Sequence, residues 1–186
     1  MSDLDTEAIV LAKMPHTSLT KIRGDGDYVQ LYKLRKEAYQ NLSAIPCPFG
    51  KEGDGHLGLA MPPAQYLMRT EQAFIVPDNP GAYNDDIGNN SGAIARARGE
   101  AKHKEAVRAY KTCRAVEAVV RNQLQRALPA ALLVEIEDEI TGLNGISIID
   151  ILDHCFDRRG HISDTLITDN NAKAPPRTLA PYATVP

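Results

Sequence analysis

The clearest hydrophobic pattern of the chain lies between residues 92 and 128. Apolar side chains recur there at every third or fourth position, at Val107, Tyr110, Cys113, Val116, Val120, Leu124 and Leu128. This spacing puts them on one face of a helix, so the pattern predicts a single long helix over 92–128 that Pro129 ends. The part before His103 is almost entirely alanine and charged residues. We therefore expect that part to project into solvent or to fray.

The same spacing predicts a helix over residues 28–43. Asp27 is a suitable N-cap for this helix, and Pro46 stops it soon after its end. Its inward positions are Leu31, Leu34, Ala38 and Leu42. A shorter helix is predicted over 5–13, closed by Pro15, in an N-terminal arm that is either ordered or mobile.

Helical spacing returns after the long helix. It predicts a helix over 130–141 with three residues on its inner face, Leu133, Ile136 and Ile140. Ser147, which with Asp150 resembles a capping box, opens a second helix that Gly160 ends. The inward residues of this second helix are Ile148, Ile149, Leu152, Cys155 and Phe156. A last short helix begins at Ser163 and carries Leu166 and Ile167.

Residues 45–91 carry most of the glycine and proline and are predicted to be irregular. The segment 56–61 is expected to be a short strand or an extended stretch. Two prolines open a short helix over 64–70, because proline is tolerated in a first helical turn. Residues 74–81 (FIVPDNPG) are expected to be extended and to end in a turn, since a residue that precedes proline avoids the α region. A polar loop follows over 84–91.

Together these elements predict a mainly α fold, a helical bundle with an irregular Gly/Pro-rich N-terminal half that contains short extended segments. We divide the chain into an N-terminal arm over 1–18, a helix plus the irregular region over 19–91, the helical bundle over 92–172, and a disordered proline-rich tail over 173–186. Composition agrees with this fold class. Only 5% of the 186 residues are aromatic and none is Trp, which favours helices over a β-sandwich.

Charge and cysteine content narrow the possible functions. The net charge of -3 argues that the whole chain is not a polyanion binder. Three scattered cysteines, an odd number, suit free thiols in a reducing compartment. The acidic N-terminus has no long apolar core, and no run approaches the roughly 18 apolar residues of a membrane span. We therefore expect a cytoplasmic protein that does not contact membranes.

One segment matches a nucleotide-binding pattern. Residues 53–58 read GDGHLG, which is the spacing G-x-G-x-x-G. That motif works only where a strand precedes it and a helix opens at its third glycine. Neither element is predicted here, so we expect a loop whose glycines supply positive φ angles. We expect His56 to hydrogen-bond loop carbonyls, since nothing near it in the sequence would make it a general base.

The histidines and cysteines do not form a metal-ligand pattern. The chain has no C-x-x-C pair and no zinc-knuckle spacing, and His154, Cys155 and His161 lack a fourth ligand at a usual offset. Cys155 faces the apolar stripe of its helix, so a buried thiol is favoured over a metal ligand. The sequence therefore predicts no catalytic residue, no metal and no cofactor, and we do not expect an enzyme.

Acidic and basic residues are separated along the chain. Residues 92–126 carry nine Lys or Arg against three Asp or Glu, whereas residues 130–157 carry seven Asp or Glu and no Lys or Arg. Segments of opposite sign attract each other within one chain or between neighbouring subunits. The alternative is a surface that is uneven by chance. The candidate acidic face for a subunit contact consists of Glu135, Glu137, Asp138 and Glu139.

These two charged segments suggest contacts rather than chemistry. On a helix, the four consecutive carboxylates point in several directions and do not converge on a metal ion. The candidate residues for weak RNA contact are Arg96, Arg98, Lys102 and Lys104. No aromatic side chain is interleaved with them to stack on bases, so we expect binding through phosphates that does not depend on RNA sequence.

Several segments together carry a family resemblance. They are LTKIRGDGDY, DGHLGLAMPPAQYLM, FIVPDNPG, and the helical tract AYKTCRAVEAVVRNQLQRALP followed by GLNGISIIDILDHCFDRRGHIS. Over residues 19–171 the chain resembles the Gag-like N-terminal part of copia-type LTR retrotransposon polyproteins, in the version common in algae and other protists. It departs from the family where FGKEGDG replaces a more glycine-rich stretch, and where Cys155 replaces a common leucine.

The resemblance implies a capsid-like helical domain that self-associates into particles around the element's RNA. Its partners would then be other copies of itself and, weakly, RNA. The alternative function is a host-adapted protein–protein interaction module without catalytic activity, which would use the same surfaces.

Overall fold

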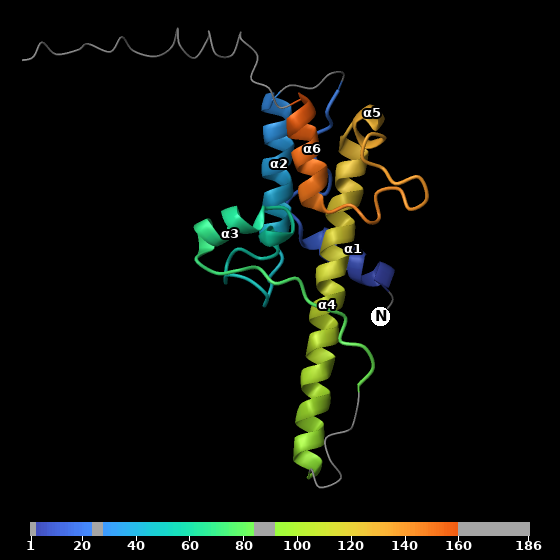
Figure 1. Cartoon of the computed structure of the whole chain (residues 1–186). Coiled ribbons are helices and arrows are strands. Elements are labelled where there is room, and N and C mark those ends of the chain that lie inside the picture. The colour runs from blue at the N-terminus through green and yellow to red at the C-terminus, as the bar shows by residue number, and fades with distance from the viewer. Residues whose placement is uncertain (1–2, 24–27, 84–91, 160–186) are drawn as a thin grey trace, which may run out of the picture.

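The computed structural model describes residues 3–23, 28–83 and 92–159, which form a mainly helical protein without a β-strand in those ranges (Figure 1). This confirms the predicted fold class. The elements in chain order are α1 (Asp3–Lys13), α2 (Tyr28–Ser43), a 3-10 helix η1 (Leu57–Leu59), α3 (Pro63–Thr70), α4 (Ala93–Ala127), α5 (Ala130–Leu133) and α6 (Ile148–Arg159). The predictions for Asp27, for the loop 84–91, for Gly160, for the helix from Ser163 and for the tail 173–186 lie outside the described residues.

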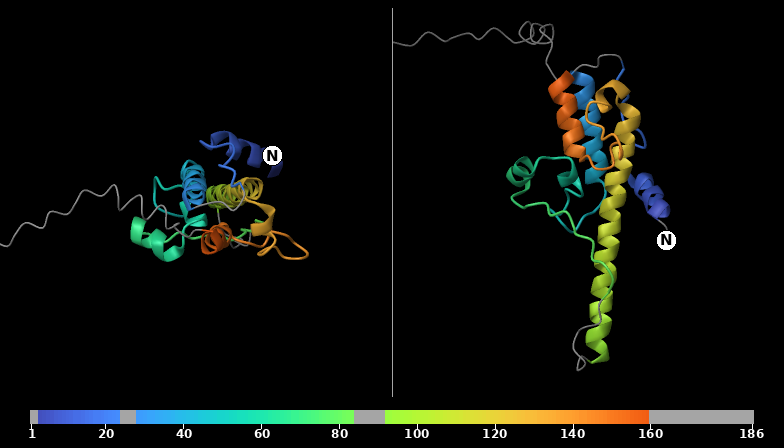
Figure 2. Two further views of the ribbon diagram at one scale, coloured as in Figure 1. Left: turned by 90° about the horizontal axis from the view of Figure 1, so that it is seen from above. Right: turned by 45° about the vertical axis from the view of Figure 1, so that its right-hand side comes forward.

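Helix α4 organises the whole structure. Its 35 residues make it about 52 Å long at 1.5 Å per residue. The C-terminal half lies beside α2 and α6, α1 crosses it near its middle, and its N-terminal half extends beyond the other elements (Figures 1 and 2). Every residue from 93 to 98 is exposed. The expectation that the first part of this helix projects is therefore confirmed.

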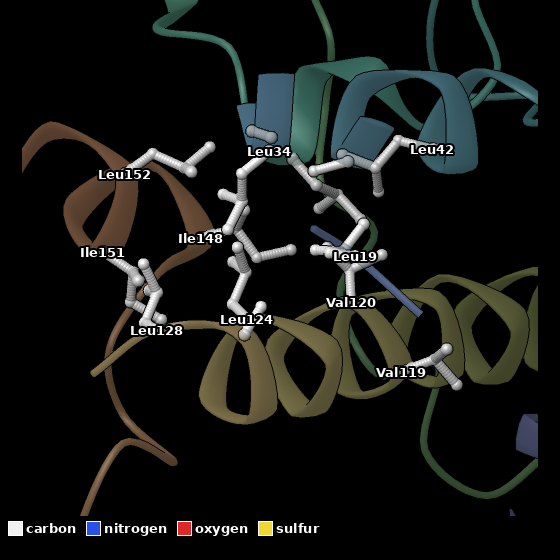
Figure 3. Packing of buried hydrophobic residues seen from close by; sticks show 14 of the residues in the cluster. Leu19, Leu34, Leu42, Val119, Val120, Leu124, Leu128, Ile148, Ile151 and Leu152 are labelled. Carbon is white, nitrogen blue, oxygen red and sulfur yellow. The ribbon is translucent and has the colours of Figure 1, made fainter. Parts of the chain in front are cut away.

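The core fills the space between α2, α4 and α6. Leu34, Leu42, Val120, Leu124 and Ile148 point toward one another there (Figure 3). The apolar residues of the predicted α4 stripe are all buried from Cys113 to Leu128, whereas some of the polar residues between them are exposed. The stripe residues before it, Val107 and Tyr110, are only half-buried, because α2 and α6 do not extend that far.

A second face of α4 is buried as well, against α1. In the view from above, α1 and α6 lie on opposite sides of α4 (Figure 2, left). Ala115 and Val119 are buried on the α1 side, and Val119 points away from the main core (Figure 3). Val10 and Met14 contribute from the N-terminal arm. The arm, for which the sequence left order and mobility open, is thus part of the packed structure over its described residues.

The segment between α1 and α2 packs into the core and does not run over its surface. Leu19 and Ile22 are buried, and the backbone N–H of Ile22 donates to the carbonyl of Ala127 at 2.8 Å. The backbone N–H and the hydroxyl of Thr20 both donate to the Glu37 carboxylate, at 2.6 and 2.8 Å. These bonds tie the segment to α2 and to the end of α4.

The strand or extended segment expected over 56–61 is wrong, because this part of the chain turns into η1. Backbone bonds between residues three apart, such as Leu59 N–H to the His56 carbonyl at 3.0 Å, close it into a tight helix. The turn begins at Gly55, whose φ is +52°. A Cβ at Gly55 would lie 2.6 to 2.7 Å from three carbonyl oxygens of residues 42–45, so only glycine fits there.

The helix expected over 130–141 is also wrong. Only α5 is helical, and the chain then turns, with paired backbone bonds between Asp138 and Gly142 at 2.9 and 3.1 Å. The Asp138 carboxylate accepts from the N–H groups of Ile140 and Thr141, which competes with helical bonding. A helix would also have placed the like charges of residues 135 and 139 one turn apart. As a result Ile140, expected on an inner face, is 93% exposed.

Helix α6 begins as predicted. The Ser147 hydroxyl accepts from the backbone N–H of Asp150 at 3.1 Å and donates to its carboxylate at 2.7 Å. Of the expected inward residues, Ile148, Leu152 and Cys155 are buried, and Ile149 and Phe156 are half-buried. The sequence prediction missed Ile151, which is fully buried.

Candidate functional site

The segment GDGHLG forms a closed structural turn. Gly53 and Gly55 have φ angles of +90° and +52°, which confirms that these glycines supply positive φ. His56 is buried, and its Nδ1 lies 2.9 Å from the carbonyl oxygen of Ile45, as expected for a loop-bonding histidine. Burial lowers the pKa of His56, against the smaller opposing effect of that hydrogen bond. The ring is therefore neutral at pH 7, with Nδ1–H donating and a buried Nε2 that has no hydrogen-bond partner among the described residues.

The two cysteines in the helices lie in the core. Cys113 and Cys155 are both buried, which confirms the expectation for Cys155. Burial raises the pKa of the Cys113 thiol to about 12 and that of Cys155 to about 11, so both stay protonated at neutral pH. Within residues 3–23, 28–83 and 92–159, no group of three or more His, Cys, Asp or Glu is placed to hold a metal ion. His161 lies outside these ranges.

The predicted acidic face lies on a loop over residues 134–142, which we call the acidic loop. Two of its four carboxylates hold the loop in place. Glu135 pairs with Nε of Arg158 at 2.8 Å, and Asp138 accepts three hydrogen bonds from Ile140 and Thr141. Those bonds lower the pKa of Asp138, the backbone N–H of Thr141 having the largest effect. Asp138 therefore stays ionised and keeps the turn closed.

The other two carboxylates of the acidic loop face solvent. Glu137 and Glu139 are exposed and form no ion pair or hydrogen bond with any residue in the described ranges. Both precede Ile140, which is exposed in the turn, and Val134 at the start of the loop is also exposed. The face that is available to a partner therefore combines two free acidic groups with apolar side chains.

The four basic candidates lie on the projecting part of α4, residues 93–104, which we call the basic projection. Arg96, Arg98 and Lys102 are exposed, and Lys104 is exposed while pairing with Glu100 at 2.8 Å. No acidic residue other than Glu100 lies in the basic projection. These side chains reach solvent and can contact phosphates, Arg96 and Lys104 on one side of the rod-like helix and Arg98 and Lys102 on the other.

Arg121, one of the nine basic residues counted over 92–126, has a different role. Arg121 is 8% exposed, and its Nη2 pairs with Glu117 at 2.6 Å. Its Nε donates to the carbonyl of Ile146 at 3.1 Å. Arg121 therefore fixes the end of the loop that precedes α6 against α4, and it is not available to a polyanion.

The acidic loop and the basic projection do not meet within one chain. Arg121 marks where the loop is anchored, and it follows Lys104 by 17 positions, or about 25 Å along the helix. Attraction between exposed charges is screened over about 10 Å at 0.1 M salt. Figure 1 shows the two regions at opposite parts of α4. Within one chain, the acidic loop therefore does not neutralise the basic projection.

A buried polar junction was missed by the sequence analysis. Asn41 is fully buried, and its side chain bonds the N–H and the carbonyl of His16 and the side-chain oxygen of Gln123, each at 2.8 Å. Gln123 in turn donates to the carbonyls of His16 and Thr17. The sequence feature that could have identified Asn41 as buried is its position, seven residues after Leu34 on the inner face of α2.

No family model, no curated protein and no solved structure matches this chain. No helix in the described ranges is long and apolar enough to cross a bilayer. The charged surfaces of α4 and of the acidic loop are therefore the features of the molecule that bear on its function.

Proposed function

We propose that the protein is a Gag-like structural subunit of a retrotransposon, whose copies self-associate into particles around the element's RNA. One observation carries the proposal: surfaces of opposite charge lie on separate parts of a rigid helical frame, too far apart to neutralise each other within one chain. Such surfaces remain available for contacts between copies. The family resemblance of residues 19–171 supports the same function.

A repeated contact between different surfaces of identical subunits builds extended assemblies. When the acidic loop of one copy meets a basic surface of the next, the first copy keeps its basic surface unused and the second keeps its acidic loop unused, so the pair can add further copies at both ends. Contacts of this type close into rings or continue as open arrays, which is what a particle wall requires. The rigid anchoring of the loop by Glu135, Asp138 and Arg121 keeps its geometry the same in every copy.

Self-association is tested by sedimentation velocity over a range of protein concentrations at 50 and 500 mM salt. We expect oligomers that grow with concentration and dissociate at the higher salt, since exposed charges are screened. The variant E137K/E139K should weaken association, whereas E52K/D78K, which changes net charge equally at exposed acidic residues elsewhere, should not. A chain that stays monomeric at all concentrations and low salt would contradict the proposal.

The basic projection is the part of the subunit proposed to meet RNA. Its cations are exposed and no Phe, Tyr or Trp is interleaved with them between residues 93 and 104, so we expect weak binding with a Kd of about 10⁻⁴ to 10⁻⁶ M at physiological salt. Replacing Arg96, Arg98, Lys102 and Lys104 by Glu should abolish binding in a filter or fluorescence anisotropy assay without loss of helical circular dichroism. Nanomolar binding that selects an RNA sequence and survives 0.5 M salt would show that a recognition site exists elsewhere.

A host-adapted interaction module is the second candidate, and a different surface favours it. Leu67 and Met68 on α3, together with Ile75 and Val76 after it, are exposed apolar side chains, and Met68 is 86% exposed. Such side chains suit a protein partner. If the chain is monomeric, does not bind RNA, and loses a partner when Met68 and Ile75 are changed to Ser, this second function is the better one.

A further inference from the structure

A groove of about 370 Å³ lies between α1 and the middle of α4. Its floor is apolar and is formed mainly by Ile9, Val10, Ile45 and Val107. Ile9 is 44% exposed there, although it belongs to an ordered helix. A groove of this size is large enough to receive an apolar side chain with its neighbouring backbone.

The rim of the groove is basic. Lys13, Lys104, Arg108 and Lys111 line it, and none of the lining residues is acidic. Lys104 is partly neutralised by Glu100, at 2.8 Å. Lys13 and Arg108 form no ion pair with a residue in the described ranges. An occupant of the groove should therefore present an apolar group flanked by negative charge.

The acidic loop of the same protein presents that combination. Ile140 is 93% exposed at the tip of a turn that two backbone hydrogen bonds close and that the Asp138 carboxylate caps. Glu137 and Glu139 precede it by three positions and one position and have no partner among the described residues. Because the turn is already ordered, burying Ile140 in a groove would cost little conformational entropy.

The groove and the loop of one chain are kept apart. Seen from above, the acidic loop lies on the α6 side of α4, and α1 lies on the opposite side (Figure 2, left). The bond from Arg121 to the carbonyl of Ile146 holds the loop near the C-terminal half of α4, whereas the α4 residues of the groove lie between Lys104 and Thr112. Ile140 therefore reaches such a groove only on another copy.

We propose that the acidic loop of one copy docks into the α1–α4 groove of a second copy, with Ile140 on the apolar floor and Glu137 and Glu139 against the basic rim. This inference rests on the proposed self-association and names the two surfaces that form it. Apolar side chains inserted into pockets and ringed by polar contacts are the usual energetic centres of protein interfaces. The groove thus serves subunit contact; Lys104, at the end of the basic projection, belongs to its rim, and Arg96, Arg98 and Lys102 remain available for RNA.

The first test removes the apolar anchor. In sedimentation velocity at 50 mM salt, I140S should weaken self-association by roughly tenfold or more, because a buried aliphatic side chain contributes that much to an affinity. I75S is the matched control, since Ile75 is also an exposed isoleucine, at 68%, but lies after α3 and outside both surfaces. It should associate like the wild type. All these residues are exposed, and unchanged circular dichroism will show that each variant folds.

The second test exchanges the charges across the proposed contact. K13E/R108E and E137K/E139K should each weaken association, and the chain that carries all four substitutions should recover it, because the signs are then opposite again. R96E/R98E combined with E137K/E139K is the control, since it reverses two cations of the basic projection instead of the groove, and it should not recover. Recovery by that control alone would place the partner surface on the basic projection and overturn the docking proposal.

Cross-linking locates the contact directly. In a C47S background, chains carrying I140C and chains carrying I9C are mixed and oxidised; the remaining native cysteines, Cys113 and Cys155, are buried. A disulfide-linked dimer should form from this pair and not from I140C mixed with I75C. Its absence while the wild type self-associates would overturn the docking proposal and leave the proposed function standing. A wild type that never self-associates would overturn both.

The groove also suits a small amphipathic acid, and dodecanoate is the probe for that outcome. If I140S associates like the wild type while dodecanoate binds the full chain and K13E/R108E abolishes that binding, the groove is a small-ligand site. The docking proposal would then be wrong. If docking is correct, dodecanoate at concentrations below its micelle threshold should compete with self-association and have no effect on the already weakened I140S chain.

Discussion

The polar junction around Asn41 should contribute more to stability than any single exposed charge. Asn41 is fully buried and makes three hydrogen bonds at 2.8 Å, joining α2 to the backbone of His16 and to Gln123 of α4. The substitution N41A removes all three. It also leaves the His16 N–H and the Gln123 side-chain oxygen without these partners, in a region that solvent reaches poorly.

The expected loss follows from these bonds. Each contributes about 1 kcal/mol net, and a buried group left without a partner costs about 1 to 3 kcal/mol. With three bonds lost and the buried Gln123 oxygen left unpaired, N41A should therefore lower the free energy of unfolding by about 4 to 6 kcal/mol, a large part of the 5 to 15 kcal/mol typical of a domain. Urea unfolding followed by circular dichroism at 222 nm measures it, at one low protein concentration so that association does not contribute.

Two further variants make the test specific. Asn122 directly precedes Gln123 in α4 but is exposed, so N122A should change stability by less than about 0.5 kcal/mol. N41A and Q123A share one bond and one acceptor, so their effects should differ from additivity by about 1 kcal/mol or more. If N41A unfolds within 1 kcal/mol of the wild type with an unchanged slope against urea, the junction does not hold the three segments together and this reasoning is wrong.

Two other substitutions test the core and the buried histidine. V116D and L152D each place a charge at a buried position, which costs several kcal/mol, so either should abolish the helical circular dichroism of the bundle; retention of signal and melting temperature would show that the core is misplaced. Because burial lowers the pKa of His56, the unfolded chain takes up a proton first as pH falls, and stability should decline on acidification below about pH 6.5. H56N keeps a donor for the Ile45 carbonyl and should show a shallower decline in urea unfolding between pH 6.5 and 5; parallel curves for the two chains would contradict the assignment.

The parts of the fold that sequence could predict are those where periodicity and burial agree. The stripe from Cys113 to Leu128 is buried because α2 and α6 both reach it, and a stripe facing two partners leaves a clear 3.6-residue pattern. The α1 face of α4 left no such pattern, since its buried residues are small, as at Ala115, or alternate with exposed charges such as Arg114. Small side chains on a long helix do not reveal that another helix crosses there.

The errors have local causes. The expected helix over 130–141 was based on the helical spacing of Leu133, Ile136 and Ile140. This spacing does not establish a helix here, because the Asp138 side chain accepts hydrogen bonds from nearby backbone N–H groups and so stabilises a turn instead. The four carboxylates of the predicted acidic face lie in a turn and not on a helix. The turn presents Ile140 outward, a residue that the helical interpretation had assigned to the core.

The charged groups of this protein fall into two sets, those that pair within the chain and those that remain available to a partner. Glu117 and Arg121, Glu135 and Arg158, and the hydrogen bonds of Asp138 stabilise the frame, and each of these groups has its partner within the chain. In the acidic loop no basic residue occurs, and in the basic projection only Glu100 opposes four cations. The internal pairs fix the loop at one place on α4 and leave single-sign charge at its tip, so the same bonds that stabilise the fold also orient the surface that we propose for the contact between copies.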